Sequence, residues 1–399
     1  MLKTKKIDLV ILAGGKGTRV SKFLKNNPKP LLKFNGISFL QYLINHFHKF
    51  PFQNTYILAG YRGNKIFQKY NNKIFNFIRI KCFVEKKTLG TGGALSILKN
   101  HVKNDFVLIN GDSILLENLN NLFTQKKIKD NLIYLTKTNN YNSNSKLSNL
   151  SLFKNYVKLS KNKKYMNAGI YFLKKNFIKN QIPVNNCSLE DDILPKLILR
   201  KKFRGIISKN FFLDIGTPTN YRNAGKLLKK VFKRKSAFFD RDGVLNYDTG
   251  YVHNIKKFKL LPNVLKSLKY LVKKNFNLFL VTNQAGIGKK KFTLNDFFNL
   301  HLTLKKNFSR KGINFDDVQF SPFHKNSIIK KYRKVSNLRK PGNGMIKKIN
   351  KKFLIDTKKS FFIGDQKKDQ LAAKKSNLYF EYVKPNLYKQ TLEILKKNK

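Results

Sequence analysis

Two groups of residues in this chain have the types and the spacing that phosphate chemistry needs. The first follows an apolar run at residues 7–12, and its members are Gly14, Gly15, Gly17, Thr18, Arg19 and Lys29. Glycines allow the backbone to approach phosphates closely and to point N–H groups at them, and the two basic side chains add positive charge. This group predicts a site that holds a nucleoside triphosphate.

Two familiar alternatives for the glycine-rich turn fail on spacing. A P-loop requires four residues between its first glycine and a Gly-Lys-Ser/Thr ending, and that ending is absent. A dinucleotide-binding fingerprint requires a third glycine at the position of Val20. The turn therefore indicates a phosphate cradle of another type.

The second group contains two aspartates, Asp240 and Asp242, directly after an apolar run at residues 236–239. Residues two apart in a strand point the same way, so both carboxylates can face one substrate. Hydrolysis of a phosphate ester can use one carboxylate as the nucleophile and the other as the proton donor to the leaving oxygen. A calcium loop is the alternative, but it needs Gly and Glu where Leu245 and Tyr251 stand.

Acidic residues are scarce, 21 in all, yet several fall at the ends of apolar runs: Asp112, Asp214, Asp240, Asp242, Asp365 and Asp369. A hydroxyl, an amide and two cations follow later runs of the second half: Thr282, Asn283, Arg339 and Lys340. Carboxylates and cations at such positions are the groups that phosphoryl chemistry uses.

The elements that must position these residues follow from alternating apolar and helical patterns. In residues 1–228 we expect strands at 7–12, 55–59, 80–84, 106–109, 132–136, 168–173 and 211–215, and helices at 39–47 and 92–98. In residues 236–395 we expect strands at 236–239, 277–281 and 360–363, and helices at 262–274, 295–311, 343–351 and 386–397. The alternation predicts an α/β protein with two domains, 1–230 and 236–399, the first with a largely parallel sheet. The basic stretch 229–235 is the predicted connector.

Length and composition bound the class of protein. The chain has 399 residues, 41% of them hydrophobic, and that length favours two cores over one. No apolar run approaches the ~20 residues of a membrane span, and the first strand-like run is too short for the core of a signal peptide. We therefore expect a cytoplasmic protein without membrane insertion. Only Cys82 and Cys187 are present, so a disulfide framework and a Cys-rich zinc site are not expected.

The formal net charge of +62 raises the question of nucleic-acid binding. The lysines are spread along the whole chain, however, and no nucleic-acid-binding motif accompanies them. We interpret the charge as compositional drift in an AT-rich coding sequence and expect no specific nucleic-acid partner. The rival class, a basic nucleic-acid-binding protein, predicts salt-sensitive affinity for DNA or RNA and no need for Asp240.

Residues 5–228 resemble the sugar-1-phosphate nucleotidyltransferase family. The motifs that carry the resemblance are, in order, LAGGKGTR at 12–19, PKPLL at 28–32, LGTGGA at 89–94, NGD at 110–112, NAGIY at 167–171, SLE at 188–190 and FLDIGTP at 212–218. The resemblance implies a Rossmann-like mixed sheet. It also implies a reaction in which a sugar 1-phosphate attacks the α-phosphorus of a nucleoside triphosphate and releases pyrophosphate.

Roles in this reaction carry over from the family to matching residues. Asp112 and Asp214 would hold Mg²⁺, while Arg19 would steady the triphosphate and Lys29 would neutralise the attacked phosphate. The base and ribose would face the turn that contains Gly90, Thr91 and Gly92, and the sugar hydroxyls would meet Asn167 and Glu190. Relatives usually have a Glu-Lys pair before the NAGIY segment, and its Glu is missing here. Either Lys158 or Lys161 could fill the role of its Lys.

Residues 236–380 resemble the haloacid-dehalogenase-like phosphatases, which have a doubly wound parallel sheet. The motifs are FDRDGVLN at 239–246, GYVH at 250–253, TNQAGIG at 282–288 and RKP at 339–341. They are closest to the subgroup of heptose 1,7-bisphosphate phosphatases and histidinol-phosphatases. The resemblance implies that Asp240 forms an aspartyl-phosphate and that Asp242 is the acid/base. Mg²⁺ would be held by Asp240, the Asp242 backbone carbonyl and Asp365.

The phosphoryl group would be bound by Thr282, Asn283 and Lys340, beside Arg339. Many members of the subgroup also hold a structural zinc in the loop before the RKP motif, through cysteines and a histidine. Here that loop, 321–338, keeps His324 but has no cysteine. We expect no zinc, and a loop that is held by other contacts or is mobile.

Together the two resemblances predict a bifunctional enzyme of nucleotide-activated heptose synthesis. The C-terminal domain would remove the 7-phosphate of a heptose 1,7-bisphosphate, and the N-terminal domain would transfer a nucleotidyl group, with GTP as the first choice of donor. The alternatives are a mannose-type sugar phosphate and a phosphatase of the histidinol-phosphate type.

Overall fold

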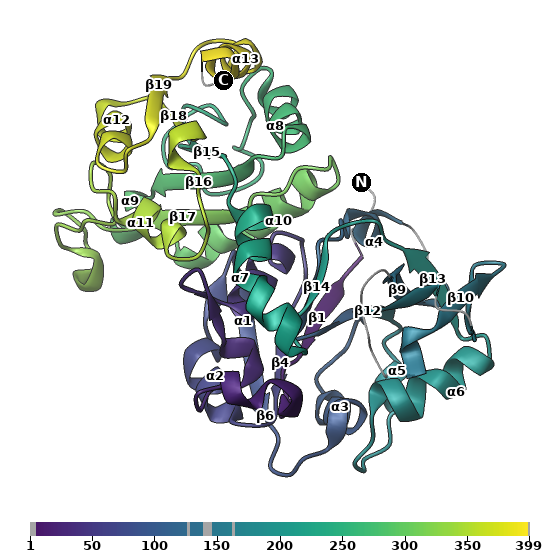
Figure 1. The fold of residues 1–399 in the computed structure, drawn as a ribbon. Coiled ribbons are helices and arrows are strands. Elements are labelled where there is room, and N and C mark those ends of the chain that lie inside the picture. The colour runs from purple at the N-terminus through teal and green to yellow at the C-terminus, as the bar shows by residue number, and fades with distance from the viewer. Residues whose placement is uncertain (1–4, 126–127, 139–145, 162–163, 398–399) are drawn as a thin grey trace. The chain divides into compact units, whose positions relative to one another are not determined.

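The fold is taken from a computed structural model that describes residues 5–125, 128–138, 146–161 and 164–397. Contacts divide the chain into two compact units (Figure 1). The first comprises Met1–Ile44 and Phe52–Leu227, and the second comprises Asn45–Pro51 and Leu228–Lys399.

The first unit is built on a ten-stranded mixed sheet. Its order is β10 (Leu150–Phe153), β11 (Tyr156–Leu159), β13 (Phe203–Ile207), β9 (Asn131–Lys137), β12 (Tyr165–Leu173), β7 (Asp105–Asn110), β1 (Ile7–Leu12), β4 (Thr55–Ala59), β6 (Ile78–Val84) and β5 (Ile74–Phe75). β7, β1, β4 and β6 are parallel, whereas β12 runs antiparallel to both β7 and β9. Every residue of β1 and β4 is buried, which is typical of parallel strands that are covered on both faces.

Helices and short elements complete the first unit. Its α-helices are α1 (Phe39–Phe47), α2 (Gly63–Tyr70), α3 (Gly90–Gly93), α4 (Asn120–Thr124), α5 (Phe177–Gln181), α6 (Leu194–Leu199) and α7 (Pro218–Phe232). Its other helical segments are η1 (Thr18–Phe23), η2 (Lys29–Leu31), η3 (Ala94–Leu98), η4 (Lys146–Ser148) and η5 (Leu189–Ile193). Two small antiparallel sheets pair β2 (Lys33–Phe34) with β3 (Ile37–Ser38) and β8 (Ser113–Leu115) with β14 (Phe212–Asp214).

The predicted connector at residues 229–235 begins inside a helix. The two units divide between Leu227 and Leu228, next to this stretch, but α7 continues through Phe232, so the basic residues Lys229 and Lys230 lie in its last turn. Positive charge at the carboxyl end of a helix is favourable because it faces the negative end of the helix dipole. Lysines in this stretch therefore extend the helix instead of interrupting it.

The second unit has a five-stranded, all-parallel sheet. Its order is β17 (Asp317–Ser321), β16 (Asn277–Asn283), β15 (Ser236–Phe239), β18 (Phe361–Gly364) and β19 (Tyr379–Tyr382). Its helices are α8 (Val264–Lys273), α9 (Ala285–Gly288), α10 (Leu294–Ser309), α11 (Gly344–Asn350), α12 (Lys367–Lys374) and α13 (Leu387–Lys397), with η6 (Lys330–Tyr332) and η7 (Thr357–Lys359) between them. The doubly wound parallel sheet and the α/β class of both units confirm the predicted fold.

Alternating residues of the central strands divide the second unit into two cores. In β15, Ala237 and Phe239 pack in one apolar cluster, and Phe238 packs in the other. Successive side chains of a strand point to opposite faces, so β15 supplies both cores. A strand buried on both faces holds the residue after its end, Asp240, in a fixed position.

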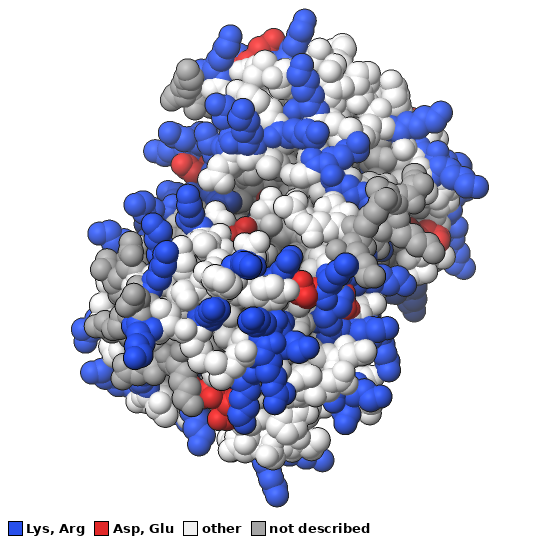
Figure 2. Space-filling model, turned by 90° about the vertical axis from the view of Figure 1, so that its right-hand side faces the viewer, with Lys and Arg blue, Asp and Glu red and all other residues white. Residues whose placement is uncertain are grey.

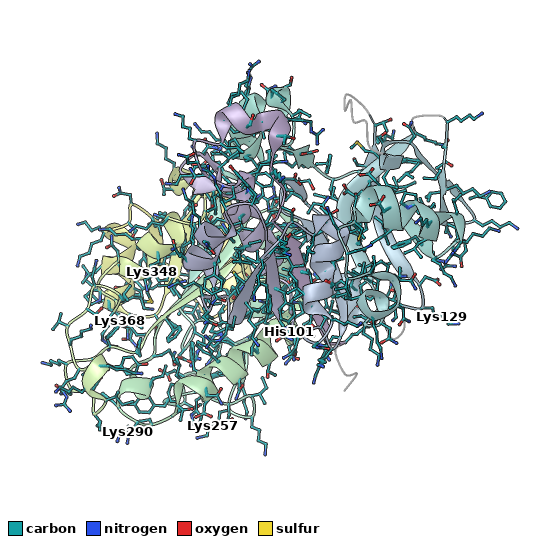
Figure 3. All side chains as sticks on the ribbon, turned by 90° about the horizontal axis from the view of Figure 1, so that it is seen from below. His101, Lys129, Lys257, Lys290, Lys348 and Lys368 are labelled. Atoms are coloured by element: carbon teal, nitrogen blue, oxygen red, sulfur yellow. The ribbon has the colours of Figure 1, made fainter. Side chains whose placement is uncertain are left out.

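Lysine and arginine side chains are scattered over the face shown in Figure 2, and few acidic side chains interrupt them. The lysines labelled in Figure 3 come from both units and include Lys129, Lys257 and Lys290, which are exposed. Among the described residues, no helix is long and apolar enough to span a membrane.

Candidate active sites

A cleft of ≈ 420 Å³ opens in the first unit where β1 and β7 end. These strands are parallel neighbours, so the segments that follow them meet at one edge of the sheet. This edge is the ordinary ligand-binding position of an open α/β sheet. The turn after β1 supplies Gly14, Gly15 and Arg19 to the cleft wall, and the segment after β7 supplies Asp112.

Asp112 and Asp214 meet in this cleft because β8 pairs with β14. Ser113 lies opposite Asp214 in that antiparallel pair, and the backbone N–H of Ile215 donates to the Asp112 carbonyl over 3.0 Å. Lys29 is buried, and its Nζ lies 2.7 Å from Asp112 Oδ2. The structure thus joins three predicted site residues that are far apart in the sequence.

The two carboxylates have opposite pKa shifts. Burial alone would raise the pKa of Asp112, but the charge and the hydrogen bond of Lys29 outweigh it and hold the pKa below its ordinary value. Burial, and then the negative charge of Asp112, raise the pKa of Asp214 to about 6. The second carboxylate is therefore repelled by the first, and a divalent cation held between them would remove that repulsion.

A second group of polar side chains gathers around Glu190, which η5 carries into the cleft. Glu190 Oε1 accepts from Asn110 Nδ2 at 2.8 Å and from Asn167 Nδ2 at 3.3 Å, and the Tyr171 hydroxyl lies 3.4 Å away. Burial raises the pKa of Glu190. Amide and carboxylate groups together offer the donors and acceptors that sugar hydroxyls need. Tyr171 was not identified as a site residue from the sequence, because its phenol is hidden inside the apolar run of β12.

Glu85 is a further residue that the sequence did not reveal. It follows β6, lines the cleft with Gly90 and Thr91, and accepts from the backbone N–H of Leu89 at 3.1 Å through Oε2. A Cβ atom at Gly14 would lie 2.6 Å from Glu85 Oε1, so the glycine makes room for this carboxylate. A lone glutamate after a strand carries no distinctive spacing, which is why sequence reasoning missed it.

Other residues that the sequence singled out are not among those that line the cleft. Gly17 has φ 67° and precedes η1, where Thr18 is exposed. The N–H of Gly92 donates to the Cys187 carbonyl over 2.9 Å and so fastens the turn. Lys158 is exposed on β11, with its Nζ 4.2 Å from the Phe153 ring centroid, and Lys161 is also exposed.

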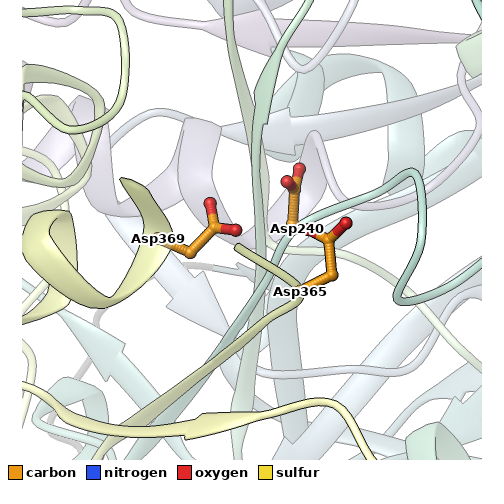
Figure 4. A group of neighbouring side chains, drawn as sticks. All are labelled: Asp240, Asp365 and Asp369. Atoms are coloured by element: carbon orange, nitrogen blue, oxygen red, sulfur yellow. The ribbon is translucent and has the colours of Figure 1, made fainter. Parts of the chain in front are cut away.

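In the second unit, three carboxylates converge at the carboxyl end of the sheet. Asp240 follows β15 and Asp365 follows β18, and these strands are parallel neighbours, while Asp369 belongs to the first turn of α12 (Figure 4). One ligand atom from each of the three lies within 4.8 Å of the others. Asp365 Oδ1 is buried and accepts no hydrogen bond from the described residues. A buried triad of this kind suggests a metal site, since a cation would satisfy that oxygen.

Crowding of the carboxylates has electrostatic consequences. Burial, then the charges of Asp240 and Asp369, raise the pKa of Asp365 to about 6. Burial also raises the pKa of Asp240, although Lys340 opposes the shift. The backbone at Gly243 passes very close to the Asp365 carboxylate. Gly243 has φ 81°, and a Cβ atom at that position would lie 2.6 Å from Asp365 Oδ2.

Lys340 connects two members of the triad. Its Nζ lies 2.7 Å from Asp240 Oδ2 and 2.6 Å from Asp369 Oδ1, and the side chain is fully buried. Asn283 holds the backbone of Lys340 at both ends, since its Oδ1 accepts from the Lys340 N–H at 3.0 Å and its Nδ2 donates to the Lys340 carbonyl at 3.1 Å. A fixed ammonium beside a carboxylate nucleophile can attract a phosphoryl group.

A turn, and not strand alternation, determines the direction of the Asp242 side chain. β15 ends at Phe239, so strand alternation does not set its direction; a turn closed by the Gly243 N–H and the Asn246 carbonyl at 2.8 Å does. Asp369, not Asp242, supplies the third side chain of the triad. Gln284 links Asp242 to Thr282, which lies at the end of β16. The Gln284 Nε2 atom donates to Asp242 Oδ2 at 3.0 Å and to Thr282 Oγ1 at 2.9 Å.

The loop 321–338 is held by protein contacts. Arg333 donates from Nε to the Ser327 carbonyl at 2.7 Å, and the rings of Phe323 and Tyr332 pack edge to face at 5.8 Å. Arg339 Nη1 lies 3.3 Å from the Phe323 carbonyl, which ties the loop to the RKP motif. These contacts agree with the first of the two expected states of the loop.

Comparisons with known proteins match the two units separately. A family model described as nucleotidyl transferase matches residues 9–146, and one described as polynucleotide kinase 3 phosphatase matches residues 235–383. The D-glycero-beta-D-manno-heptose-1,7-bisphosphate 7-phosphatase of Rhodopseudomonas palustris is 34% identical over 146 residues, which are 37% of this chain and 81% of that protein. The protein of the same name from Escherichia coli is 34% identical over 141 residues, 35% of this chain and 74% of that protein. Among solved structures, HddC from Yersinia pseudotuberculosis has 26% sequence identity and a TM-score of 0.45, covering 55% of this chain and 98% of its own.

Proposed function

Because this chain belongs to the D-glycero-beta-D-manno-heptose-1,7-bisphosphate 7-phosphatase family and carries a nucleotidyltransferase domain before that part, we propose that it is a bifunctional enzyme of nucleotide-heptose synthesis. The second unit removes the 7-phosphate of a heptose 1,7-bisphosphate, and the first transfers a guanylyl group from GTP to the 1-phosphate that remains. The observation that carries the proposal is Asp240 at the end of β15, with Lys340 Nζ at 2.7 Å and two further carboxylates beside it.

Phosphate release divides into two steps at Asp240. Its carboxylate oxygen attacks the phosphorus, the bond from phosphorus to the sugar oxygen breaks, and Asp242 gives a proton to that oxygen. Water then attacks the aspartyl-phosphate while Asp242 takes a proton from it, which releases phosphate and restores Asp240. Lys340 and Thr282 hold the phosphoryl oxygens. Mg²⁺ on Asp240, Asp365 and the Asp242 carbonyl would offset the negative charges that otherwise repel each other.

Nucleotidyl transfer takes place in the cleft of the first unit. An oxygen of the sugar 1-phosphate attacks the α-phosphorus, and the bond to the pyrophosphate breaks, so positioning and positive charge supply most of the rate. Arg19 and the turn containing Gly14 and Gly15 bind the triphosphate, and Lys29 faces the attacked phosphate. Asp112 and Asp214 are the residues that would hold Mg²⁺, while Asn167 and Glu190 bind sugar hydroxyls.

Phosphate release from a set of substrates tests the proposed heptose specificity. Purified protein with Mg²⁺ is given D-glycero-beta-D-manno-heptose 1,7-bisphosphate, a hexose bisphosphate or histidinol phosphate, and phosphate release is followed. We expect the heptose bisphosphate to have a kcat/KM at least about tenfold above the others. Equal or greater activity on histidinol phosphate would contradict the heptose assignment.

The Glu85 carboxylate, which lines the cleft with Gly90 and Thr91, supports the choice of GTP that the family resemblance implies. Guanine presents an N–H and an amino group on one edge, and a carboxylate can accept from both, whereas adenine has an acceptor at the first of these positions. Glu85→Gln is expected to raise the KM for GTP by about 10–100-fold, since a hydrogen bond to a charged group is worth ~1.5–3 kcal/mol. Phosphate release from the bisphosphate serves as the internal control. A variant that keeps its discrimination between GTP and ATP would contradict this role for Glu85.

Magnesium should stabilise the second unit through the triad. With Mg²⁺ at about a hundredfold above its dissociation constant, we expect a gain of about 2.7 kcal/mol in the free energy of unfolding. Asp365→Asn should raise the melting temperature of the metal-free protein, because it removes a repelled carboxylate. It should also abolish the increase in melting temperature that Mg²⁺ causes by binding to the triad. The measurement is thermal unfolding by calorimetry, with Asp356→Asn as a control outside the triad. A lower melting temperature for metal-free Asp365→Asn would contradict the argument from repulsion.

A further inference from the structure

Arg241 lies between the two aspartates of the phosphatase motif, yet its side chain is only 1% exposed. Its guanidinium binds the Asp242 carboxylate in a bidentate pair, with Nε 3.1 Å from Oδ1 and Nη2 2.9 Å from Oδ2. A bidentate pair fixes the orientation of a carboxylate as well as its position. Because the guanidinium is buried, it is not available as a ligand for substrate.

The guanidinium is itself held from the interior of the unit. Nη2 donates to the Val252 carbonyl at 2.6 Å, Nη1 lies 3.3 Å from His301 Nε2, and the group lies over the Phe297 ring at 5.7 Å. Burial, and then the charge of Arg241, hold the pKa of His301 well below its ordinary value. A neutral imidazole has one nitrogen that accepts, so His301 can accept from Arg241. Residues of α10 therefore hold the Arg241 guanidinium, which in turn holds Asp242.

Two amides complete the donor set around Asp242. Asn246 Nδ2 lies 3.0 Å from Oδ1, and Gln284 Nε2 lies 3.0 Å from Oδ2. Each carboxylate oxygen thus receives one bond from Arg241 and one from an amide. Gln284 is also buried, and its Oε1 lies 3.3 Å from Arg241 Nη2, so the two supporting side chains are tied to each other.

We propose that Arg241 and Gln284 are positioning residues that orient the ionised Asp242 carboxylate. When Asp242 holds the proton for the leaving oxygen, the protonated oxygen gives up one of its two bonds, and the remaining bonds keep the group in place. Gln284 also bonds to Thr282 Oγ1 at 2.9 Å, which links the position of the acid/base to that of the phosphoryl-binding hydroxyl. The inference rests on the proposed phosphatase activity and adds to it the residues that orient its proton donor. Displacement of a catalytic group by about 1 Å can slow a reaction by about a hundredfold, so this support matters for the rate.

The test is steady-state kinetics of phosphate release by the full chain carrying Arg241→Lys. Lysine keeps the charge but cannot form the bidentate pair. We expect kcat to fall by about 10–100-fold while KM changes by less than about twofold, because the side chain does not contact substrate. An unchanged kcat, or a rise in KM with kcat retained, would overturn the proposal. If the wild-type protein released no phosphate at all, the proposed function would fail instead.

Matched variants separate positioning from a general effect on the fold. Arg234→Lys makes the same change at a half-buried arginine that precedes the start of β15, and it should leave kcat unchanged. Gln284→Met, which leaves no buried charge unpaired, should lower kcat by about 5–10-fold and supplies the readout if Arg241→Lys does not fold. In an Asp242→Asn background, Arg241→Lys should cause no further loss, since both act through one group. Additive losses in that background would contradict a role through Asp242.

Discussion

Asp240→Asn is expected to lower phosphate release from a heptose 1,7-bisphosphate by at least about 10⁴-fold, because it removes the proposed nucleophile and an amide cannot take its place. Pyrophosphate release from a sugar 1-phosphate and GTP should stay at the wild-type rate, since that reaction uses the first unit. The amide is nearly the same size as the carboxylate and removes charge from a crowded triad, so the fold should be retained. Both reactions are followed on one preparation by phosphate and pyrophosphate assays.

Asp356→Asn is the matched control for this substitution, because Asp356 precedes η7 and lies outside the triad. It should leave both reactions unchanged. Loss of both reactions in a folded Asp240→Asn protein would contradict independent sites. Retention of phosphate release would remove Asp240 from the role of nucleophile.

Asp112→Asn should have the reverse selectivity, with nucleotidyl transfer lowered by about 10³-fold or more and phosphate release unchanged. The substitution removes a carboxylate of the proposed Mg²⁺ pair and the partner of Lys29, whose Nζ lies 2.7 Å from Asp112 Oδ2. Removing a divalent cation from a phosphoryl-transfer site costs several kcal/mol of transition-state stabilisation. The measurement is pyrophosphate release with GTP and a heptose 1-phosphate.

Asp112→Asn also leaves the buried Lys29 without its carboxylate partner, which can destabilise the fold, so a second variant is needed. Asp214→Asn keeps the Lys29–Asp112 pair and removes the carboxylate whose pKa burial and Asp112 raise to about 6. It should lose transfer activity without loss of melting temperature. Full transfer activity in Asp214→Asn would mean that the two carboxylates do not share a role.

Strand ends were the part of both sites that the sequence could predict. Asp112, Asp240 and Asp365 each follow an apolar run, and parallel neighbouring strands bring such positions to one edge of a sheet. The strands at one edge of the ten-stranded sheet were harder to recognise in the sequence. β10, β11 and β13 are short and partly exposed, so their apolar pattern is weak.

The roles of the residues that support the reacting groups could not be predicted from spacing. Asp369 stands out in the sequence as an acidic residue near Asp365, but it lies in the first turn of a helix, where a solvated cap is ordinary, and only the fold turns it toward Lys340. Arg241 reads as a surface cation in so basic a chain, but the turn after β15 buries it. Glu85 is recognised only because the cleft wall closes around it. Tertiary packing, not local pattern, determines each of these three positions.

Phosphorus NMR of one reaction mixture tests the central claim most directly. Wild-type protein is given D-glycero-beta-D-manno-heptose 1,7-bisphosphate, GTP and Mg²⁺, and the resonances are followed in time. The account predicts loss of the 7-phosphate signal with release of phosphate, followed by the diphosphate signals of a guanosine diphosphate sugar and pyrophosphate. Loss of the 1-phosphate signal as free phosphate, or nucleotide transfer to a sugar that keeps its 7-phosphate, would contradict it.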